Sequence, residues 1–271
     1  MIVSGEGVAP QEWSVTPLDP ARVRQLRRQA IFVAGKLDPQ AFDRSAIAPF
    51  AVRLKASTWA TLAHSAEQAF AELLEVERAL ATDARAWRWL DIDPVLRRVL
   101  DRAREAGGRR DLRVARFDFH PTADGWRISE VNADVPGGYI EAGVLTRLAA
   151  EFFPECDAPP DPAEVLAKAV SNSLAGGTVA LVHATAFVDD QQVVRRMGEA
   201  LAQHGVASVM AAPDHLERGQ GGGPVRLATT GQAVDGVIRF YPGEWLSVLP
   251  RRGAWARVLA DPALPQVNPL T

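Results

Sequence analysis

The chain of 271 residues contains a single cysteine, Cys156, so no internal disulfide can form. Structural disulfides are typical of oxidising compartments, and their absence favours a cytoplasmic location. Glu155 and Asp157 flank the cysteine, and negative charge opposes formation of the thiolate that a reactive cysteine needs. Cys156 is therefore not expected to carry chemistry.

Long apolar runs and basic runs are also missing. No hydrophobic stretch approaches the roughly 20 residues of a transmembrane helix, and the N-terminus lacks the basic and apolar regions of a secretory signal. Basic and acidic residues are interspersed, with a formal net charge of −3. These absences argue against a membrane or a nucleic acid as the principal partner. Nothing in the sequence indicates an oligomeric state.

Two neighbouring segments predict a β-hairpin. Apolar and polar residues alternate from Val114 to His120, as in a half-buried strand, and the run from Trp126 to Val131 is a second candidate strand. If Ala123-Asp124-Gly125 forms a three-residue loop, Gly125 takes the left-handed backbone conformation that such loops require.

This loop determines which residues lie opposite each other in the hairpin. The expected pairs are Thr122 with Trp126, His120 with Ile128, Asp118 with Glu130, and Arg116 with Asn132. Directly opposed residues share a face, so the last two pairs would form one polar cluster. The opposite face would be a core surface made of Ala115, Phe117, Phe119 and Val131. A slip of one residue would send half of the cluster to the other side.

The polar cluster suits a magnesium–triphosphate site. Mg²⁺ prefers hard oxygen ligands and is usually held by a few carboxylates together with substrate phosphates. Arg116 offers a fixed fork of donors that matches a phosphoryl group. Two opposed carboxylates, Asp118 and Glu130, repel each other unless a cation lies between them. The alternative is a solvated hairpin face on which Arg116 neutralises Asp118.

A glycine turn and a helix follow the second strand. Pro136-Gly137-Gly138 precedes a helical pattern that begins at Tyr139 or Glu141 and runs to about Ala150. A strand, a glycine turn and a helix start present backbone N–H groups and the positive end of a helix dipole to an anion. Taken singly, the three residues are an ordinary tight turn. Beside an acid-rich hairpin they become a candidate part of the site.

The segment RFDFH…EVNADVPGGYIEA resembles the metal- and phosphate-binding segment of the glutathionylspermidine synthetase family, whose members have a circularly permuted ATP-grasp fold. The family has an R-x-D strand, then an E-x-N-x-D strand, then a short turn that ends in Glu. The resemblance implies an ATP- and Mg²⁺-dependent ligase that joins a small-molecule acid to a small-molecule amine through an acyl phosphate. It assigns the γ-phosphate contact to Arg116 and the Mg²⁺ ligands to Asp118, Glu130 and Asn132.

The same resemblance places the turn and later segments on the substrate side of the site. Gly137, Gly138 and the closing Glu141 are the expected substrate contacts of the turn. Glutathione-contacting members carry small polar residues there, whereas this chain reads VPGG, which leaves open whether glutathione is the acid. Less specific similarity continues through residues 182–190, 237–245 and 268–269. His183 is a further candidate contact, although a lone histidine at a strand end is more often structural.

Lysine is scarce, with only Lys36, Lys55 and Lys168 in the chain. ATP-grasp enzymes hold the nucleotide phosphates with lysines, and in the resembled family these come later than the segment equivalent to Thr271. We therefore expect the chain to match the N-terminal part of the ligase pattern, with the metal-side groups but without the adenine pocket. The alternative, from another class, is a non-catalytic binding module or an incomplete fragment of such a ligase.

The remaining pattern predicts a mixed α/β fold in two units. Residues 1–165 would hold helices packed on an antiparallel ATP-grasp-type sheet with the metal and phosphate site. Residues 166–271 would form a smaller, parallel α/β domain of the pre-ATP-grasp type on the substrate side.

Expected helices in the first unit run from Pro20 towards Phe32, from Ser57 to Leu80 and from Pro94 to Ala106. They would pack on the back of the hairpin sheet. The apolar stripe of the longest is expected to be core, and it consists of Trp59, Leu62, Ala66, Phe70, Leu73 and Leu74.

The second unit should follow a helix that begins at Asp161-Pro162, with the acid as N-cap. Its expected elements are the strands Val179–Val182, Val206–Met210 and Val234–Phe240, and the helix Asp190–Gln203. Strand, helix and strand with short connections predict a right-handed unit and a parallel sheet. The loop 183–189 would lie at the carboxyl edge, where open α/β sheets bind ligands.

Overall fold

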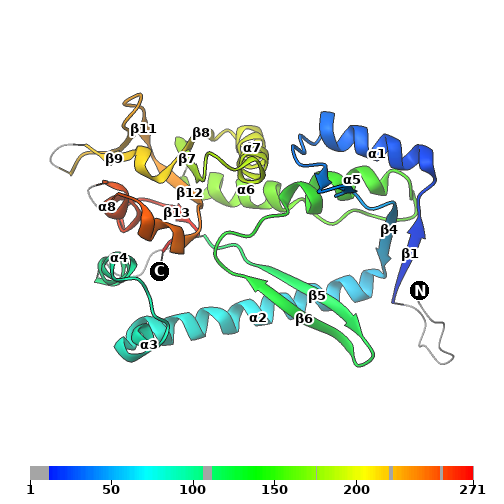
Figure 1. The fold of residues 1–271 in the computed structure, drawn as a ribbon, viewed down its shortest axis with the longest axis horizontal. Helices are drawn as coiled ribbons and strands as arrows, with labels where there is room; N and C mark the ends of the chain where they lie inside the picture. The colour runs from blue at the N-terminus through cyan, green and yellow to red at the C-terminus, as the bar shows by residue number, and fades with distance from the viewer. Residues whose placement is uncertain (1–11, 106–111, 175, 220–221, 251–252, 271) are drawn as a thin grey trace.

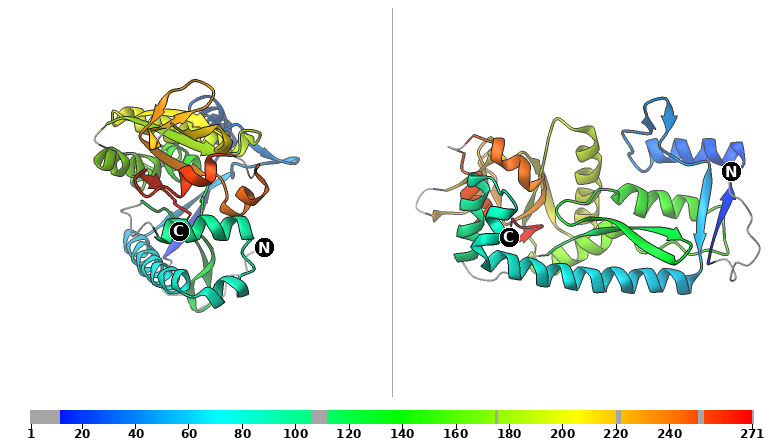
Figure 2. Two further views of the ribbon diagram at one scale, coloured as in Figure 1. Left: turned by 90° about the vertical axis from the view of Figure 1, so that its left-hand side faces the viewer. Right: turned by 60° about the horizontal axis from the view of Figure 1, so that its bottom comes forward.

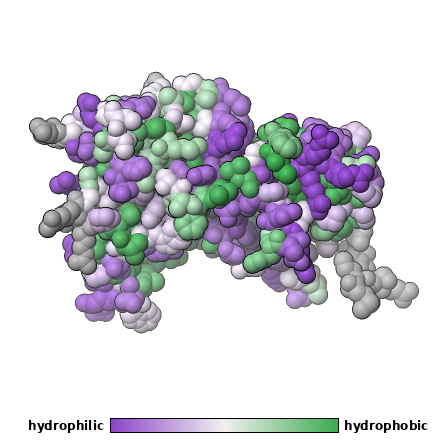
Figure 3. All heavy atoms as spheres, turned by 45° about the horizontal axis from the view of Figure 1, so that its top comes forward, coloured by the Kyte–Doolittle hydropathy of each residue, from purple (hydrophilic) through white to green (hydrophobic). Residues whose placement is uncertain are grey.

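The computed structural model describes residues 12–105, 112–174, 176–219, 222–250 and 253–270. The fold is mixed α/β, as expected, and is elongated (Figure 1). A parallel sheet with its helices forms one end, a helix and a β-ribbon from the N-terminal region form the other, and a long helix runs between them (Figures 1 and 2). On the face drawn in Figure 3, hydrophilic residues are interrupted by small hydrophobic patches, and the end that carries the first helix also exposes hydrophobic side chains such as Phe32 and Val33.

The parallel sheet has the strand order β13-β12-β7-β8. Its strands are β7 (Thr178–His183), β8 (Ala207–Ala211), β12 (Gly236–Phe240) and β13 (Gln266–Val267). Strand β7 reads TVALVH and is buried along nearly its whole length, which is typical of a parallel strand covered on both faces. The predicted strands and their parallel pairing are confirmed.

One face of this sheet is covered by α6 (Pro162–Leu174) and α7 (Val188–Gln203), which share a core with Val179 and Leu181 of β7. Helix α6 begins as predicted, because the Oδ1 atom of Asp161 accepts a hydrogen bond from the Ala163 N–H at 2.9 Å. The division expected between residues 165 and 166 falls inside this helix.

The other face is covered by α4 (Pro94–Glu105), α8 (Trp255–Leu259) and a 3₁₀ turn, η4 (Gly243–Val248). A small antiparallel sheet closes the same side, and its strands are β9 (Leu216–Arg218), β10 (Val225–Leu227) and β11 (Ala233–Val234). Val95 and Val99 of α4 join this core together with Ala180 and Val182. The prediction that α4 packs on the hairpin is therefore wrong, because its apolar residues pack on the parallel sheet instead.

The opposite end of the molecule is built around α1 (Pro20–Phe32), which starts at the predicted residue. Asp19 caps it by accepting hydrogen bonds from two backbone N–H groups of the first turn. Its buried residues Leu26 and Ala30 pack on a π-helical turn, η1 (Ile140–Leu145), and on α5 (Thr146–Ala150). Short antiparallel pairs flank this core: β1 (Trp13–Pro17) with β4 (Phe50–Leu54), and β2 (Gln40–Ala41) with β3 (Arg44–Ser45).

Helix α2 (Ala56–Thr82) leads along one side of the molecule to α3 (Ala84–Trp89), with the hairpin lying over it (Figure 2). Its apolar stripe was expected to be core, and that expectation is wrong. The stripe is half-buried at best, Trp59 is 46% exposed, and none of its residues belongs to the three core clusters found among the described residues. The reason is geometric: only the narrow, two-stranded hairpin lies over α2, and it covers too little surface to bury the stripe.

Gly143 lies in the π-helical turn, where the Asp161 carboxylate comes so close that any amino acid with a Cβ atom would collide with it. A Cβ atom at this position would overlap the carboxylate of Asp161, which caps α6 and accepts a hydrogen bond from Arg196 at 2.8 Å. We expect Gly143→Ala to lower the free energy of unfolding by about 2 kcal/mol, measured by urea denaturation. Gly137→Ala is the matched control, because a Cβ there meets nothing within 4 Å. Equal stability of the two variants would contradict the prediction.

Candidate functional site

The hairpin consists of β5 (Arg116–Thr122) and β6 (Gly125–Asn132), paired antiparallel. Asp118 lies opposite Glu130 and Arg116 lies opposite Asn132, so the predicted register of the polar cluster is confirmed. Directly opposed residues share a face of the ribbon. The four polar side chains therefore start from the same side.

The register near the tip of the hairpin differs from the prediction. Thr122 pairs with Gly125 rather than Trp126, and His120 pairs with Arg127 rather than Ile128. A bulge between Asp118 and Phe119 then leaves one extra residue, Ser129, on β6 and restores the expected pairing beyond it. Gly125 has a φ of +97°, which its predicted role in the turn requires.

The predicted core face of the hairpin is not a core. Phe117 and Phe119 are only half-buried, Val131 is 42% exposed, and neither strand contributes to the three core clusters of the described chain. Among the described residues the hairpin is a two-stranded sheet of its own. Two strands alone bury little apolar surface. The larger antiparallel sheet of ATP-grasp type that was expected here is not found among the described residues.

The four side chains of the polar cluster are paired along each strand. The guanidinium of Arg116 donates to both carboxylate oxygens of Asp118, at 2.7 and 3.0 Å, and to the carbonyl of Gly137 at 3.4 Å. The amide of Asn132 donates to Glu130 at 2.7 Å. The hydrogen bonds from Arg116 hold the pKa of Asp118 below its usual range. Asp118 is therefore ionised at neutral pH, as a carboxylate ligand of a cation must be.

The glycine turn lies beside this cluster. Arg116 joins the hairpin to the turn through the Gly137 carbonyl, and Gly138 has a φ of +91°. The helix that follows opens with the wide π-helical turn η1, in which the Ala142 N–H donates to the Gly138 carbonyl at 2.9 Å. Single π-helical turns are frequent at functional sites. Glu141 is in this first turn and is close enough for its charge to raise the pKa of Arg116, after the larger effect of Asp118.

A buried lysine, which the sequence did not place in the site, holds Glu141. The Nζ atom of Lys36 donates to Glu141 at 2.6 Å and to Asp38 at 2.9 Å, and the lysine is 4% exposed. Burial lowers the pKa of Lys36, but its two hydrogen bonds outweigh that effect and the net pKa is raised. The lysine is therefore charged at neutral pH.

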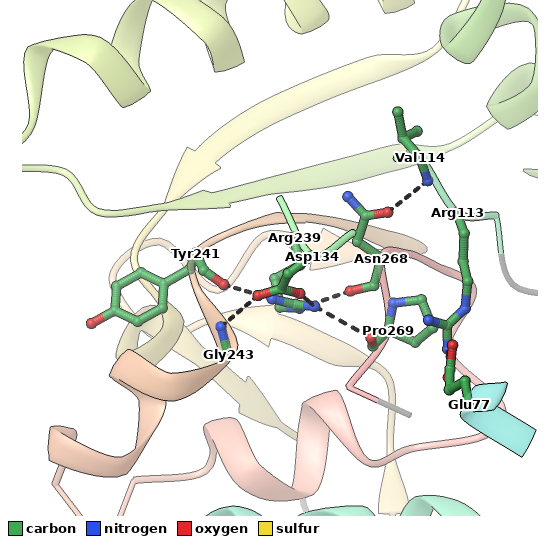
Figure 4. Close-up of polar contacts among 9 residues, drawn as sticks. All are labelled: Glu77, Arg113, Val114, Asp134, Arg239, Tyr241, Gly243, Asn268 and Pro269. Atoms are coloured by element: carbon green, nitrogen blue, oxygen red, sulfur yellow. Dashed lines mark hydrogen bonds and ion pairs between the residues drawn. The ribbon is translucent and has the colours of Figure 1, made fainter. Parts of the chain in front are cut away.

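The end of the hairpin is anchored to the parallel sheet by Arg239, which lies in β12 and is 2% exposed (Figure 4). Its guanidinium forms an ion pair with Asp134 and donates to the carbonyls of Asn268 and Tyr241, both at 2.7 Å. Asp134 also accepts a hydrogen bond from the Gly243 N–H at 2.8 Å. The junction therefore lies at the carboxyl ends of β12 and β13, the edge at which open α/β sheets bind ligands.

Asn268 ties the other end of the hairpin to the same place. Its side chain accepts a hydrogen bond from the Val114 N–H at 2.9 Å (Figure 4). Its backbone N–H donates to the Leu112 carbonyl at 2.9 Å. Its φ of +54° is one that asparagine tolerates better than most residues. Both ends of the hairpin thus join the parallel sheet, which places the polar cluster near its carboxyl edge.

His183, the remaining predicted contact, lies at the end of β7 and is 2% exposed. Its Nδ1 atom is 3.2 Å from the Leu181 carbonyl. Burial raises the pKa of Asp190, which follows in the first turn of α7. The structure places His183 in the sheet rather than among Arg116, Asp118, Glu130 and Asn132. Within the part of the chain that the structure describes, no hydrogen bond joins His183 to these four residues.

The structure thus brings most of the predicted residues together and adds three that sequence reasoning missed. These are Lys36, Asp134 and Arg239. Arg239 could have been found from the sequence, because it interrupts the apolar strand VIRF and a buried charge must be paired. Nothing local marked Lys36 for the site, because the partner that links it there, Glu141, lies more than 100 residues away along the chain.

Comparison with known proteins adds no assignment. No family model matches the chain, and a search of curated proteins finds no match. The resemblance to the glutathionylspermidine synthetase family therefore stands on the quoted motifs.

The described residues contain no group of three or more His, Cys, Asp or Glu side chains placed to hold a metal ion. Within the same residues, no helix has the length and apolar character needed to cross a membrane.

Proposed function

We propose that the protein is an ATP- and Mg²⁺-dependent carboxylate–amine ligase of the glutathionylspermidine synthetase type. The γ-phosphoryl group of ATP would pass to a substrate carboxylate, giving ADP and an acyl phosphate. The amine nitrogen would then attack the acyl carbon, lose a proton and displace phosphate. The acid and the amine are small molecules, and the parallel sheet unit would be the substrate-side domain.

One observation carries the proposal: Asp118 lies directly opposite Glu130, with Arg116 and Asn132 opposed one step further along the same ribbon. This register puts two carboxylates, a carboxamide and a guanidinium on one face. The glycine turn adjoins them through the 3.4 Å hydrogen bond from Arg116 to Gly137. Such a set matches the hard oxygen ligands of a magnesium ion and the donors that contact a phosphoryl group.

The residues present fit a magnesium ion by the chemistry of their donors. Asp118, Glu130 and the side-chain oxygen of Asn132 are hard ligands, and two carboxylates plus phosphate oxygens suffice for Mg²⁺. When bound, Mg²⁺ neutralises charge on the transferring phosphoryl group. Arg116 would contact the phosphoryl oxygens, while Glu141 and the turn at Gly137 and Gly138 would orient the acid.

Glu130→Gln tests the proposal, because it removes one ligand charge and keeps the shape of the side chain. We expect Mn²⁺, used as a probe for Mg²⁺, to bind at least about tenfold more weakly, measured by calorimetry or electron paramagnetic resonance. Mg²⁺-dependent ADP release from ATP should fall with it. Asp124→Asn is the control, since Asp124 is an exposed acid at the tip of the same hairpin. Unchanged Mn²⁺ affinity in Glu130→Gln would refute the site.

A second candidate, a non-catalytic binding module, is favoured by the internal pairing of the cluster. Both oxygens of Asp118 are taken by Arg116, and Glu130 is taken by Asn132. A solvated ribbon would be satisfied by these pairs without any ion. The two candidates separate by turnover: a ligase releases ADP from Mg-ATP when a mixture of carboxylic acids and amines is added, and a binding module does not.

A further inference from the structure

Lys36 occupies the junction of three elements that surround the candidate site. After α1 ends, Gly35 takes a φ of +68° and the Lys36 N–H donates to the Ala30 carbonyl at 2.9 Å. This cap fixes the backbone of the lysine. Its side chain then reaches Glu141 in the turn after the hairpin.

A series of polar contacts links the segment around Lys36 to the first turns of α7. Asp38 accepts a hydrogen bond from Lys36 at 2.9 Å, and the Leu37 N–H donates to the side chain of Gln192 at 3.0 Å. Asp38 is also in contact with Gln192 and with Asp189. The lysine therefore connects the substrate-side sheet to the glycine turn.

Glu141 lies within electrostatic reach of two cations. Lys36 contacts it directly at 2.6 Å. Glu141 also lies just after the glycine turn, where the Gly137 carbonyl accepts a hydrogen bond from Arg116 at 3.4 Å, and its charge is one of those that raise the pKa of Arg116. If the ammonium were removed, Glu141 would lose its hydrogen-bonded partner and would attract the guanidinium of Arg116. That attraction competes with the bonds from Arg116 to Asp118 and Gly137.

We propose that Lys36 is a positioning residue of this site, which by pairing with Glu141 keeps Arg116 on Asp118 and Gly137. The inference rests on the proposed function and goes beyond it, because Lys36 belongs to no part of the phosphate motif. Without Lys36, Arg116 would shift towards Glu141, which frees Asp118 for a bare cation and removes the guanidinium from a polyphosphate.

The test uses two probes of opposite charge, Mn²⁺ and inorganic tripolyphosphate with Mn²⁺, measured by calorimetry. Lys36→Met should strengthen Mn²⁺ binding by about three- to tenfold and weaken tripolyphosphate binding by about tenfold. Lys36→Arg retains the charge and should restore both affinities to within about threefold of the original. A lysine that only stabilises the fold would move both affinities in the same direction or leave both unchanged, and either result would overturn the inference.

A double variant checks that Lys36 acts through Glu141 and covers the case in which Lys36→Met does not fold. Lys36→Met combined with Glu141→Gln leaves no unpaired charge at position 141 and is compared with Glu141→Gln alone. The two should hold tripolyphosphate within about threefold of each other, since the partner through which Lys36 acts is already gone. A further tenfold loss in the double variant would show that Lys36 acts independently and would overturn the inference.

The behaviour of the unaltered protein separates the two proposals. If it binds neither probe, the proposed function fails, and the role of Lys36 fails with it. If it binds both probes and Lys36→Met lacks the opposite shifts, only the inference about Lys36 fails.

Discussion

Replacing Arg239 by methionine is expected to lower the free energy of unfolding by about 3–5 kcal/mol. The guanidinium is 2% exposed and donates to backbone carbonyls as well as to Asp134. Methionine fills a similar volume but leaves the carbonyls of Asn268 and Tyr241 without this donor in a buried place. An unsatisfied buried acceptor costs the full desolvation of that group.

The same variant should loosen the hairpin from the parallel sheet. Asp134 would lose its ion pair, and its remaining bond to the Gly243 N–H would weaken, so this amide should exchange hydrogen faster. Urea denaturation and hydrogen–deuterium exchange measure the two effects. Arg127→Met on the exposed edge of the hairpin is the matched control and should change stability by less than about 0.5 kcal/mol. A loss below about 1 kcal/mol for Arg239→Met would show that the junction is not held by this residue.

Under the proposed ligase function, Arg116→Lys is expected to lower the rate of Mg-ATP turnover by about 10²–10³-fold. The guanidinium donates two hydrogen bonds to Asp118 and one to Gly137, a geometry that the single ammonium of lysine cannot reproduce. A phosphoryl group in transfer needs this fixed fork more than it needs the charge alone. Turnover is followed as ADP release in the presence of a mixture of carboxylic acids and amines.

The effect of Arg116→Lys on stability should be small, which separates a role in chemistry from one in folding. The side chains of Arg116 and Asp118 are 41% and 32% exposed, and exposed ion pairs contribute about 1 kcal/mol or less. Arg127→Lys is the control on the same hairpin and should leave turnover unchanged. Turnover of Arg116→Lys within about threefold of the unaltered protein would contradict the assigned role.

Local signals in the sequence were sufficient wherever a structure depends on neighbouring residues. Helix α1 starts at Pro20 after the cap Asp19, and α6 starts after Asp161, because a cap acts within one turn. The strand β7 was recognisable because a run of buried apolar residues is typical of a parallel sheet.

The hairpin shows how a correct result can depend on two deviations that cancel. The turn closes one residue earlier than expected, and the bulge at Ser129 adds one residue on the same strand. The pairs that matter, Asp118 with Glu130 and Arg116 with Asn132, are therefore as predicted, while those near the tip are not. Bulges depend on contacts and twist along the ribbon, and no local pattern announces this one.

Local sequence patterns could not predict which elements pack against each other. The stripe of α2 has helical spacing, yet Trp59 is 46% exposed, because spacing indicates which residues share a face and not what covers that face. The apolar face of α4 was recognisable in the same way, but only the fold showed that it packs on the parallel sheet.

The sequence by itself determined the caps, the strands of the parallel sheet and the set of polar residues on the hairpin, since each depends on interactions a few residues apart. The tertiary structure alone decided that Lys36 pairs with Glu141 and that Arg239 anchors Asp134, both across more than 100 residues. Such pairs form because burial removes water from a charge, which must then find a partner wherever the fold brings one.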